Sequence, residues 1–161
     1  MQEGGLGRFI LLVLCAGGLV YMATRPQTGG IEDLLREASA PSSPRDRIRV
    51  ITQGAEVALT SHVERGMVTI VDFYSEGCPP CRALSGPLHQ AVEQTPGVAL
   101  KIVDLNRPGV NGIDWKSPVA KQYGIQSIPY LKVYDQAGQE RASGSKARDW
   151  VVAWLNDGRR K

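Results

Sequence analysis

Cys78 and Cys81 are the residues of this chain whose type and spacing most clearly suggest chemistry. They lie three positions apart, directly after the apolar run 67–74 and at the start of a stretch with helical composition. Two cysteines in a first helical turn can bring their sulfur atoms within bonding distance. The first sulfur would lie at the positive end of the helix dipole, which stabilises the thiolate that attacks a disulfide. The spacing therefore predicts Cys78 as a nucleophile and Cys81 as the thiol that resolves the mixed disulfide.

The sequence gives less support for the other common roles of a cysteine pair, which are zinc binding, haem attachment and a structural disulfide. A zinc site needs two further ligands, and beyond the N-terminal segment the chain offers only His62 and His89, without the spacing of a ligand pair. Covalent haem attachment needs a histidine directly after the second cysteine, where this chain has Arg82. A structural bridge would close a very short loop and stabilise little. Metal binding and a structural bridge stay open as alternatives.

Asp72 is a carboxylate within the run 67–74, six residues before Cys78. Ionising an isolated carboxylate in a buried strand is unfavourable, so its pKa is expected to be raised. Such a group can exchange a proton near neutral pH. The alternative is an acid at a strand edge that faces solvent.

Apolar runs predict the strands that position these residues. The runs 67–74 and 98–105 have the β-branched and aromatic composition of strands buried on both faces. A third strand is expected at 128–134, joined by a turn at 135–138 to a short further strand.

The remaining elements complete an α/β pattern. Two short runs, 48–51 and 56–59, predict an N-terminal β-hairpin. Helices are expected at 82–94, with a kink at Gly86-Pro87, at 118–123, and at 146–156, whose apolar face carries Trp150, Val151, Trp154 and Leu155. Trp115, in the loop 106–116, is expected to plug the core rather than to form a lid. The order of elements predicts a three-layer α/β/α fold with a central mixed sheet.

Two segments of the sequence resemble the thioredoxin superfamily. The stretch V-D-F-Y-S-E-G-C-P-P-C-R at 71–82 looks like its strand and active-site turn, and G-I-Q-S-I-P-Y-L at 124–131 looks like its cis-proline segment. The two lie in the family's order, and the resemblance spans about 67–155. The expected N-terminal hairpin is more similar to the membrane-anchored extracytoplasmic branch of the superfamily.

The resemblance implies a thioredoxin-like fold and a role for several residues. Pro129 would be cis and face the cysteines, with the Ile128 backbone pairing to an extended substrate strand. Gly144 would lie in the same groove. Asp72 would deprotonate the resolving thiol of Cys81, through a water. Pro129 as an ordinary proline at a strand start, and Gly144 as a turn glycine, are the alternatives.

The sequence departs from the family at positions near the cysteines. Gly77 stands where the family has a tryptophan, and Tyr74 replaces a deeper aromatic residue, which predicts a substrate groove that is more open and less apolar. Lys101 is a candidate neighbour of Asp72, although its spacing is offset from that of the family's lysine.

Two prolines and an acid are expected to affect the redox couple. Pro79 and Pro80 remove two amide N–H groups from the first helical turn, and Glu76 adds a negative charge near Cys78. We therefore expect a thiol of moderate acidity and a reducing couple.

The N-terminal part of the chain differs in composition from the rest. Residues 9–23 carry no charge and follow Arg8, which is typical of a membrane-targeting segment. Bulky residues at the positions that would precede a cleavage site favour an uncleaved anchor, with a cleaved signal or a buried helix as alternatives. We thus expect an anchor or signal at 1–23, a flexible linker at 24–46 and the thioredoxin-like domain at 47–161.

Composition and charge limit the possible functions. The chain has 161 residues, of which 42% are hydrophobic and 22% charged, and its net charge is only +3 with no basic patch for nucleic acid. The sequence predicts a monomeric reductase of protein disulfides, tethered to the cytoplasmic membrane, facing the periplasm and fed by a membrane thiol donor, without metal or cofactor. A disulfide oxidase, a cytochrome c maturation reductant and a non-catalytic peptide- or metal-binding module are the alternatives.

Overall fold

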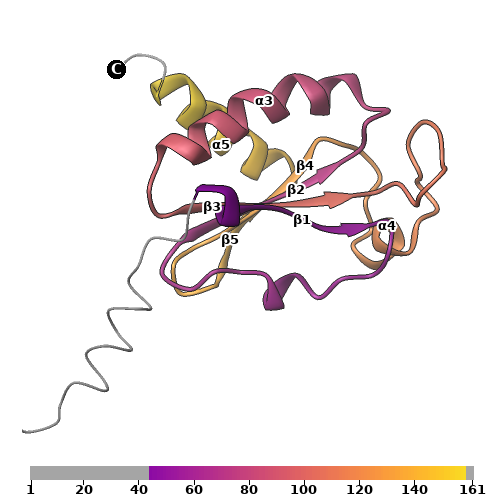
Figure 1. Ribbon diagram of the computed structural model, residues 1–161, viewed down its shortest axis with the longest axis horizontal. Coiled ribbons are helices and arrows are strands. Elements are labelled where there is room, and N and C mark those ends of the chain that lie inside the picture. Colours follow the sequence, from indigo (N-terminus) through magenta and orange to yellow (C-terminus); the bar gives the residue numbers. More distant parts are fainter. Residues whose placement is uncertain (1–43, 159–161) are drawn as a thin grey trace, which may run out of the picture. The chain divides into compact units, whose positions relative to one another are not determined.

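A mixed sheet of five strands lies at the centre of the computed structural model, which describes residues 44–158 (Figure 1). The strand order is β1-β3-β2-β4-β5. The first three run parallel, β4 is antiparallel to β2, and β5 is antiparallel to β4. The strands are β1 Ile48–Gln53, β2 Val68–Tyr74, β3 Val98–Asp104, β4 Tyr130–Tyr134 and β5 Glu140–Ser143. The helices are α2 Pro44–Arg47, α3 Pro79–Gln94, α4 Pro118–Gln122 and α5 Gly144–Gly158, with a 3-10 turn, η1, at Leu59–Ser61.

Helices and loops cover both faces of the sheet. On one face, Ile70 and Leu100 pack against α3 and α5. On the other, Phe73 and Val103 pack against α4 and the segment around η1 (Figure 1). Strand β2 is buried on both faces, which explains its near-continuous apolar sequence. The expected three-layer α/β/α fold with a mixed sheet is confirmed.

The expected N-terminal β-hairpin is wrong. Strand β1 pairs in parallel with β3, so that Val50 lies opposite Ile102, and residues 56–59 form no strand. The backbone of Val57 is bonded elsewhere: its N–H donates to Gln122 Oε1 at 2.9 Å, and its carbonyl accepts from the Tyr123 hydroxyl at 2.5 Å. The end of α4 thus takes the hydrogen bonds that a second hairpin strand would have used.

Two tryptophans lie at the surface, contrary to expectation. Trp115 is 42% exposed and does not plug the core, and Trp150 is 51% exposed. The buried stripe of α5 is made by Ala147, Val151 and Leu155, which are spaced four residues apart. Trp150 falls beside this stripe, one residue before Val151.

Arg47 ties the start of the domain to the end of α3. Its side chain is buried, and its Nη1 donates to the carbonyl oxygens of Val92, Thr95 and Val98 at 2.8–2.9 Å. Val92 lies in the last turn of α3, Thr95 is the C-cap residue of that helix, and Val98 is the first residue of β3. The guanidinium therefore caps α3 and anchors α2 and β1 against it.

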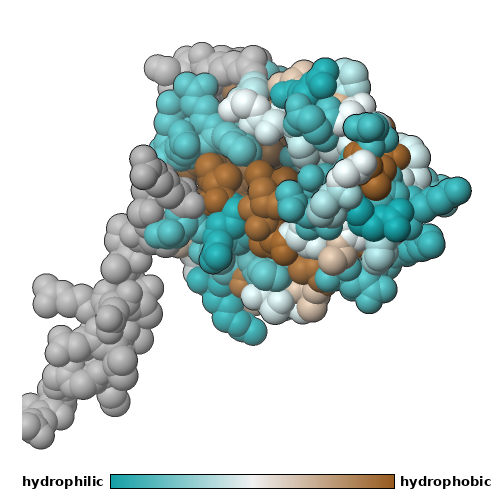
Figure 2. Space-filling model, turned by 45° about the vertical axis from the view of Figure 1, so that its right-hand side comes forward, coloured by the Kyte–Doolittle hydropathy of each residue, from teal (hydrophilic) through white to brown (hydrophobic). Residues whose placement is uncertain are grey.

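Figure 2 shows a mostly hydrophilic face with hydrophobic residues gathered near its middle. Within residues 44–158, no helix has the length and apolar character needed to cross a membrane. The expected anchor at 1–23 lies outside the described residues, as does the expected linker except for its last residues, which belong to α2.

Candidate active site

Cys78 and Cys81 form a disulfide at the amino end of α3. Cys78 is the N-cap residue of the helix, Cys81 lies in its first turn, and their Cα atoms are 5.3 Å apart. Both residues are buried. The expectation that this spacing brings the two sulfur atoms together is confirmed.

At the start of α3, Cys81 is the first residue after Cys78 with a backbone N–H to donate to the Cys78 sulfur. Pro79 and Pro80 occupy the first two helical positions and have no N–H. The N–H of Cys81 is the next along the chain, and it donates to Cys78 Sγ at 3.2 Å. The helix therefore stabilises a charged sulfur with fewer amides than a helix start without prolines would.

The Ile128–Pro129 segment lies beside Cys78. The Ile128–Pro129 peptide bond is cis, and the carbonyl oxygen of Ile128 lies 3.8 Å from Cys78 Sγ. Gly144 starts α5 with a φ of +62°, and a Cβ there would lie 3.3 Å from the ring of Tyr130, the residue after Pro129. The structure thus brings Ile128 and Pro129 to the sulfur and places Gly144 against the same segment.

Asp72 is buried below α3. Only 2% of the residue is exposed, and burial raises the pKa of its carboxyl to about 7. Because side chains alternate along a strand, Asp72 lies on the same face as Ile70, which packs against α3. Its neighbours on the adjacent strands are Ile102 and Leu131, and its Oδ1 has no hydrogen-bond partner among the described residues. This environment disfavours the ionised carboxylate.

The expected approach of Lys101 to Asp72 is wrong. Lys101 lies opposite Val71 in the sheet, so its side chain points to the other face. There it is buried and forms an ion pair with Glu64, next to a cavity of about 280 Å³. The offset of one residue in the sequence moves the cation to the opposite side of the sheet.

Gly77 is covered by the loop 106–116, which we call the Gly112 loop. A Cβ on Gly77 would lie 2.5 Å from the carbonyl oxygen of Gly112, so a side chain at this position would collide with the loop. Loop backbone therefore fills the space next to this residue, and the expected openness of the groove stays a prediction.

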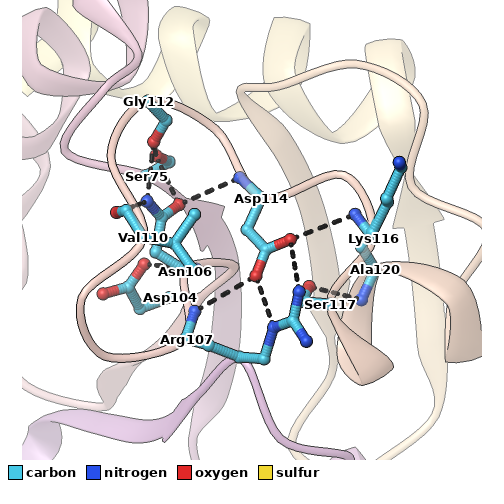
Figure 3. A network of polar contacts seen from close by, with 10 residues as sticks. All are labelled: Ser75, Asp104, Asn106, Arg107, Val110, Gly112, Asp114, Lys116, Ser117 and Ala120. Carbon is cyan, nitrogen blue, oxygen red and sulfur yellow. Dashed lines mark hydrogen bonds and ion pairs between the residues drawn. The ribbon is translucent and has the colours of Figure 1, made fainter.

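A polar network holds the Gly112 loop in this place (Figure 3). Ser75 Oγ lies 2.8 Å from Asn106 Oδ1 and accepts from the Gly77 N–H at 3.2 Å. The amide nitrogen Nδ2 of Asn106 donates to the carbonyls of Gly112, at 2.6 Å, and Val110, at 3.0 Å. Within the loop, the contacts of Asn106 thus join the active-site turn to the Gly112 backbone.

An ion pair closes the base of the same loop. Arg107 Nε lies 2.7 Å from Asp114 Oδ2, and Arg107 Nη2 lies 3.2 Å from Oδ1. The hydrogen bond from Arg107 lowers the pKa of the Asp114 carboxyl below its ordinary value. The two residues are only seven positions apart, yet no motif in the sequence of the loop predicts that they pair.

Tyr74 and Glu76 form another contact that the sequence did not reveal. The Tyr74 hydroxyl donates to the Glu76 carboxylate, and burial together with this acid raises the pKa of Tyr74 to about 12. Arg82 Nη1 donates to the Glu76 carbonyl at 3.0 Å. Glu76 is thus held near the cysteine pair by residues on both sides of it.

This fold and site define a dithiol–disulfide exchange protein: a mixed sheet carries a Cys-x-x-Cys disulfide at a helix start, next to a cis-proline. Among the described residues, no three His, Cys, Asp or Glu side chains cluster as metal ligands would.

Comparison with known proteins gives the family. The model of the thioredoxin family matches residues 51–157. A thioredoxin from Streptomyces clavuligerus is 40% identical over 70 residues, which cover 44% of this chain and 57% of that protein. A thioredoxin from Chlamydia muridarum is 32% identical over 95 residues, covering 58% of this chain and 84% of that one. The structure of a Trichomonas vaginalis thioredoxin is similar in fold, with a TM-score of 0.51 and 24% identity, covering 72% of this chain and 98% of that one.

This chain belongs to the thioredoxin family. It is a thiol–disulfide oxidoreductase with a Cys-x-x-Cys pair at disulfide distance.

Proposed function

We propose that this protein reduces disulfide bonds in protein substrates, with Cys78 as the nucleophile and Cys81 as the resolving thiol. The observation that carries the proposal is the position of Cys78 at the amino end of α3, with its sulfur 3.8 Å from the Ile128 carbonyl oxygen. A substrate strand beside Ile128 and Pro129 would present its disulfide to that sulfur.

The proposed reaction exchanges one disulfide for another. The Cys78 thiolate attacks a substrate sulfur, the substrate S–S bond breaks, and the departing thiolate takes a proton. The Cys81 thiolate then attacks Cys78 Sγ, which releases the second substrate thiol and forms the Cys78–Cys81 disulfide. Two electrons pass to the substrate, and a thiol donor reduces the protein again.

Asp72 is proposed to accept the proton of Cys81. A carboxyl with a pKa of about 7 is populated in both protonation states near neutral pH, so it can take up and release a proton in each cycle. Its place on the α3 side of the sheet, below the helix that carries Cys81, supports this role.

The direction of the reaction is proposed from the charges and donors around Cys78. The couple becomes more oxidising when the thiolate is stabilised. Here Pro79 and Pro80 remove two donors, and Glu76 contributes a nearby negative charge. These features favour a reductase over an oxidase.

We also propose that residues 1–23 tether the protein to the cytoplasmic membrane, with the catalytic domain in the periplasm. A membrane thiol protein would then supply electrons, and the protein would act as a monomer. The uncharged segment 9–23 after Arg8 supports the tether.

Insulin reduction by the full chain tests the reductase proposal. We expect turnover with dithiothreitol as electron donor, and its loss in Cys78→Ser. Cys81→Ser should accumulate a mixed disulfide with insulin, because the second thiol that resolves it is missing. Equal activity of Cys78→Ser and the unsubstituted chain would contradict the proposal and favour a binding module.

Equilibration with glutathione tests the direction. We expect a reduction potential below about −180 mV, on the reducing side of protein disulfide isomerase. A value near about −120 mV would place the protein among the oxidants.

A further inference from the structure

We propose that the Gly112 loop forms a second wall of the substrate site and binds an apolar side chain of the polypeptide substrate through Val110 and Trp115. This inference rests on the proposed reduction of protein disulfides, and it adds the part of the substrate that the protein recognises.

The loop lies directly against the residue that precedes the nucleophile. The Gly112 carbonyl occupies the space where a side chain on Gly77 would be, and Cys78 follows in the chain. The Ile128 carbonyl lies 3.8 Å from Cys78 Sγ. The cis-proline segment thus lies beside Cys78, and the Gly112 loop lies against Gly77, the residue before it. A substrate strand that extends past the Cys78 sulfur on the Gly77 side would meet this loop.

The loop is held in a fixed shape before any substrate binds. Asn106 Nδ2 donates to the carbonyls of both Val110 and Gly112, and Asn106 Oδ1 accepts from the Ser75 hydroxyl in the active-site turn (Figure 3). The Arg107–Asp114 pair joins the two ends of the loop. A binding surface that is already ordered loses less conformational entropy when a partner binds, which increases affinity.

The loop displays apolar side chains to solvent. Val110 is 37% exposed and Trp115 is 42% exposed, and they are two of the five large hydrophobic residues exposed in the described part of the chain. The other three lie on β1 and α5. Exposed tryptophans in fixed surroundings are frequent anchors of protein–protein contacts.

The occupant is a polypeptide segment with an apolar side chain near its disulfide. Cys78 is only 2% exposed, so a substrate must lie closely along the site to reach its sulfur. A small disulfide such as oxidised glutathione has no apolar side chain to place on Val110 or Trp115. A polypeptide can extend beyond its reacting cysteine and bury that apolar surface, which stabilises the complex.

Single-turnover kinetics with the pre-reduced full chain test this inference. The double variant Val110→Ser/Trp115→Ser is compared with the unsubstituted chain on insulin and on oxidised glutathione. The matched control is Val50→Ser/Trp150→Ser, which removes the same residue types from exposed positions on β1 and α5. We expect the loop variant to react about tenfold more slowly with insulin and within about twofold of normal with glutathione disulfide. The control variant should reduce insulin and oxidised glutathione at the same rates as the unsubstituted chain.

Other results of these measurements would contradict either the role of the Gly112 loop or the reductase proposal. An insulin rate in the loop variant equal to that of the unsubstituted chain would overturn the inference while leaving the reductase proposal intact. Equal losses on both disulfides would also overturn it, because they would indicate a general effect on the cysteines. If the unsubstituted chain reduced neither disulfide, the reductase proposal itself would fail, and this inference with it.

Discussion

At the scale of single residues, the surroundings of Asp72 show what a sequence can predict. Its burial follows from the apolar residues on either side of it, which are neighbours in the chain. Which residues face it depends on the register between strands, and there Ile102 lies where Lys101 was expected. Asp72 is therefore a buried acid with apolar neighbours on both adjacent strands.

The raised pKa of Asp72 predicts a pH-dependent stability. Between its ordinary pKa of 3.8 and its folded value of about 7, the folded protein binds the proton more tightly than the unfolded chain does. Stability from this group is therefore lost as pH rises through that range. Between pH 5 and pH 8 the loss should be about 2 to 3 kcal/mol.

Urea denaturation of the oxidised protein at pH 5 and pH 8 measures this effect. The asparagine of Asp72→Asn cannot ionise. The decrease in the free energy of unfolding from pH 5 to pH 8 should therefore be about 2 to 3 kcal/mol smaller in this variant than in the unsubstituted protein. Asp149→Asn, on the exposed side of α5, is the control and should behave as the unsubstituted protein. If the free energy of unfolding of Asp72→Asn decreased with pH as much as that of the unsubstituted protein, groups other than Asp72 would cause the pH dependence.

At the scale of elements, the central strands and the long helices could be predicted, and the local connections could not. Strands β2 and β3 coincide with apolar runs in the sequence, so local composition predicts them and their burial in the fold agrees with it. The segment 56–59 has a strand-like composition, but its hydrogen bonds go to Gln122 and Tyr123, more than sixty residues later. Such a choice depends on the whole fold, and the short run itself carries no sign of it.

The cap of α3 by Arg47 gives a prediction at this scale. Replacing Arg47 with alanine removes the buried donor to the carbonyls of Val92 and Thr95, at the end of α3, and of Val98, at the start of β3, at a cost of about 2 to 3 kcal/mol. We expect Arg47→Ala to lower the Tm by roughly 10 °C. Arg49→Ala, an exposed position on β1, should change it little. Thermal unfolding followed by circular dichroism compares the two, and equal Tm values would show that the cap contributes no stability.

At the scale of the whole molecule, the site is assembled from segments far apart in the chain. Cys78 and Ile128 are fifty residues apart, and Ser75 and Gly112 are thirty-seven apart. The first pair could be anticipated, because both segments carry motifs that resemble a known family. The second could not, because Gly112 contributes only backbone, and the signal for its position is the absence of a side chain at Gly77.

The proposed tether gives the last prediction, because it decides where this site works. An uncharged segment inserts into a bilayer through its apolar side chains, and an arginine at its centre opposes insertion by about 2.5 to 3.5 kcal/mol. Leu14 lies two residues from the middle of the segment 9–23. In bacterial cells, we expect the full chain to stay with the membranes after alkaline carbonate extraction and Leu14→Arg to be released in large part. Leu14→Ile keeps the apolar character and should stay with the membranes. Recovery of a soluble periplasmic form whose mass lacks the N-terminal residues would instead identify the segment as a cleaved signal, and the protein would then meet its electron donor by diffusion.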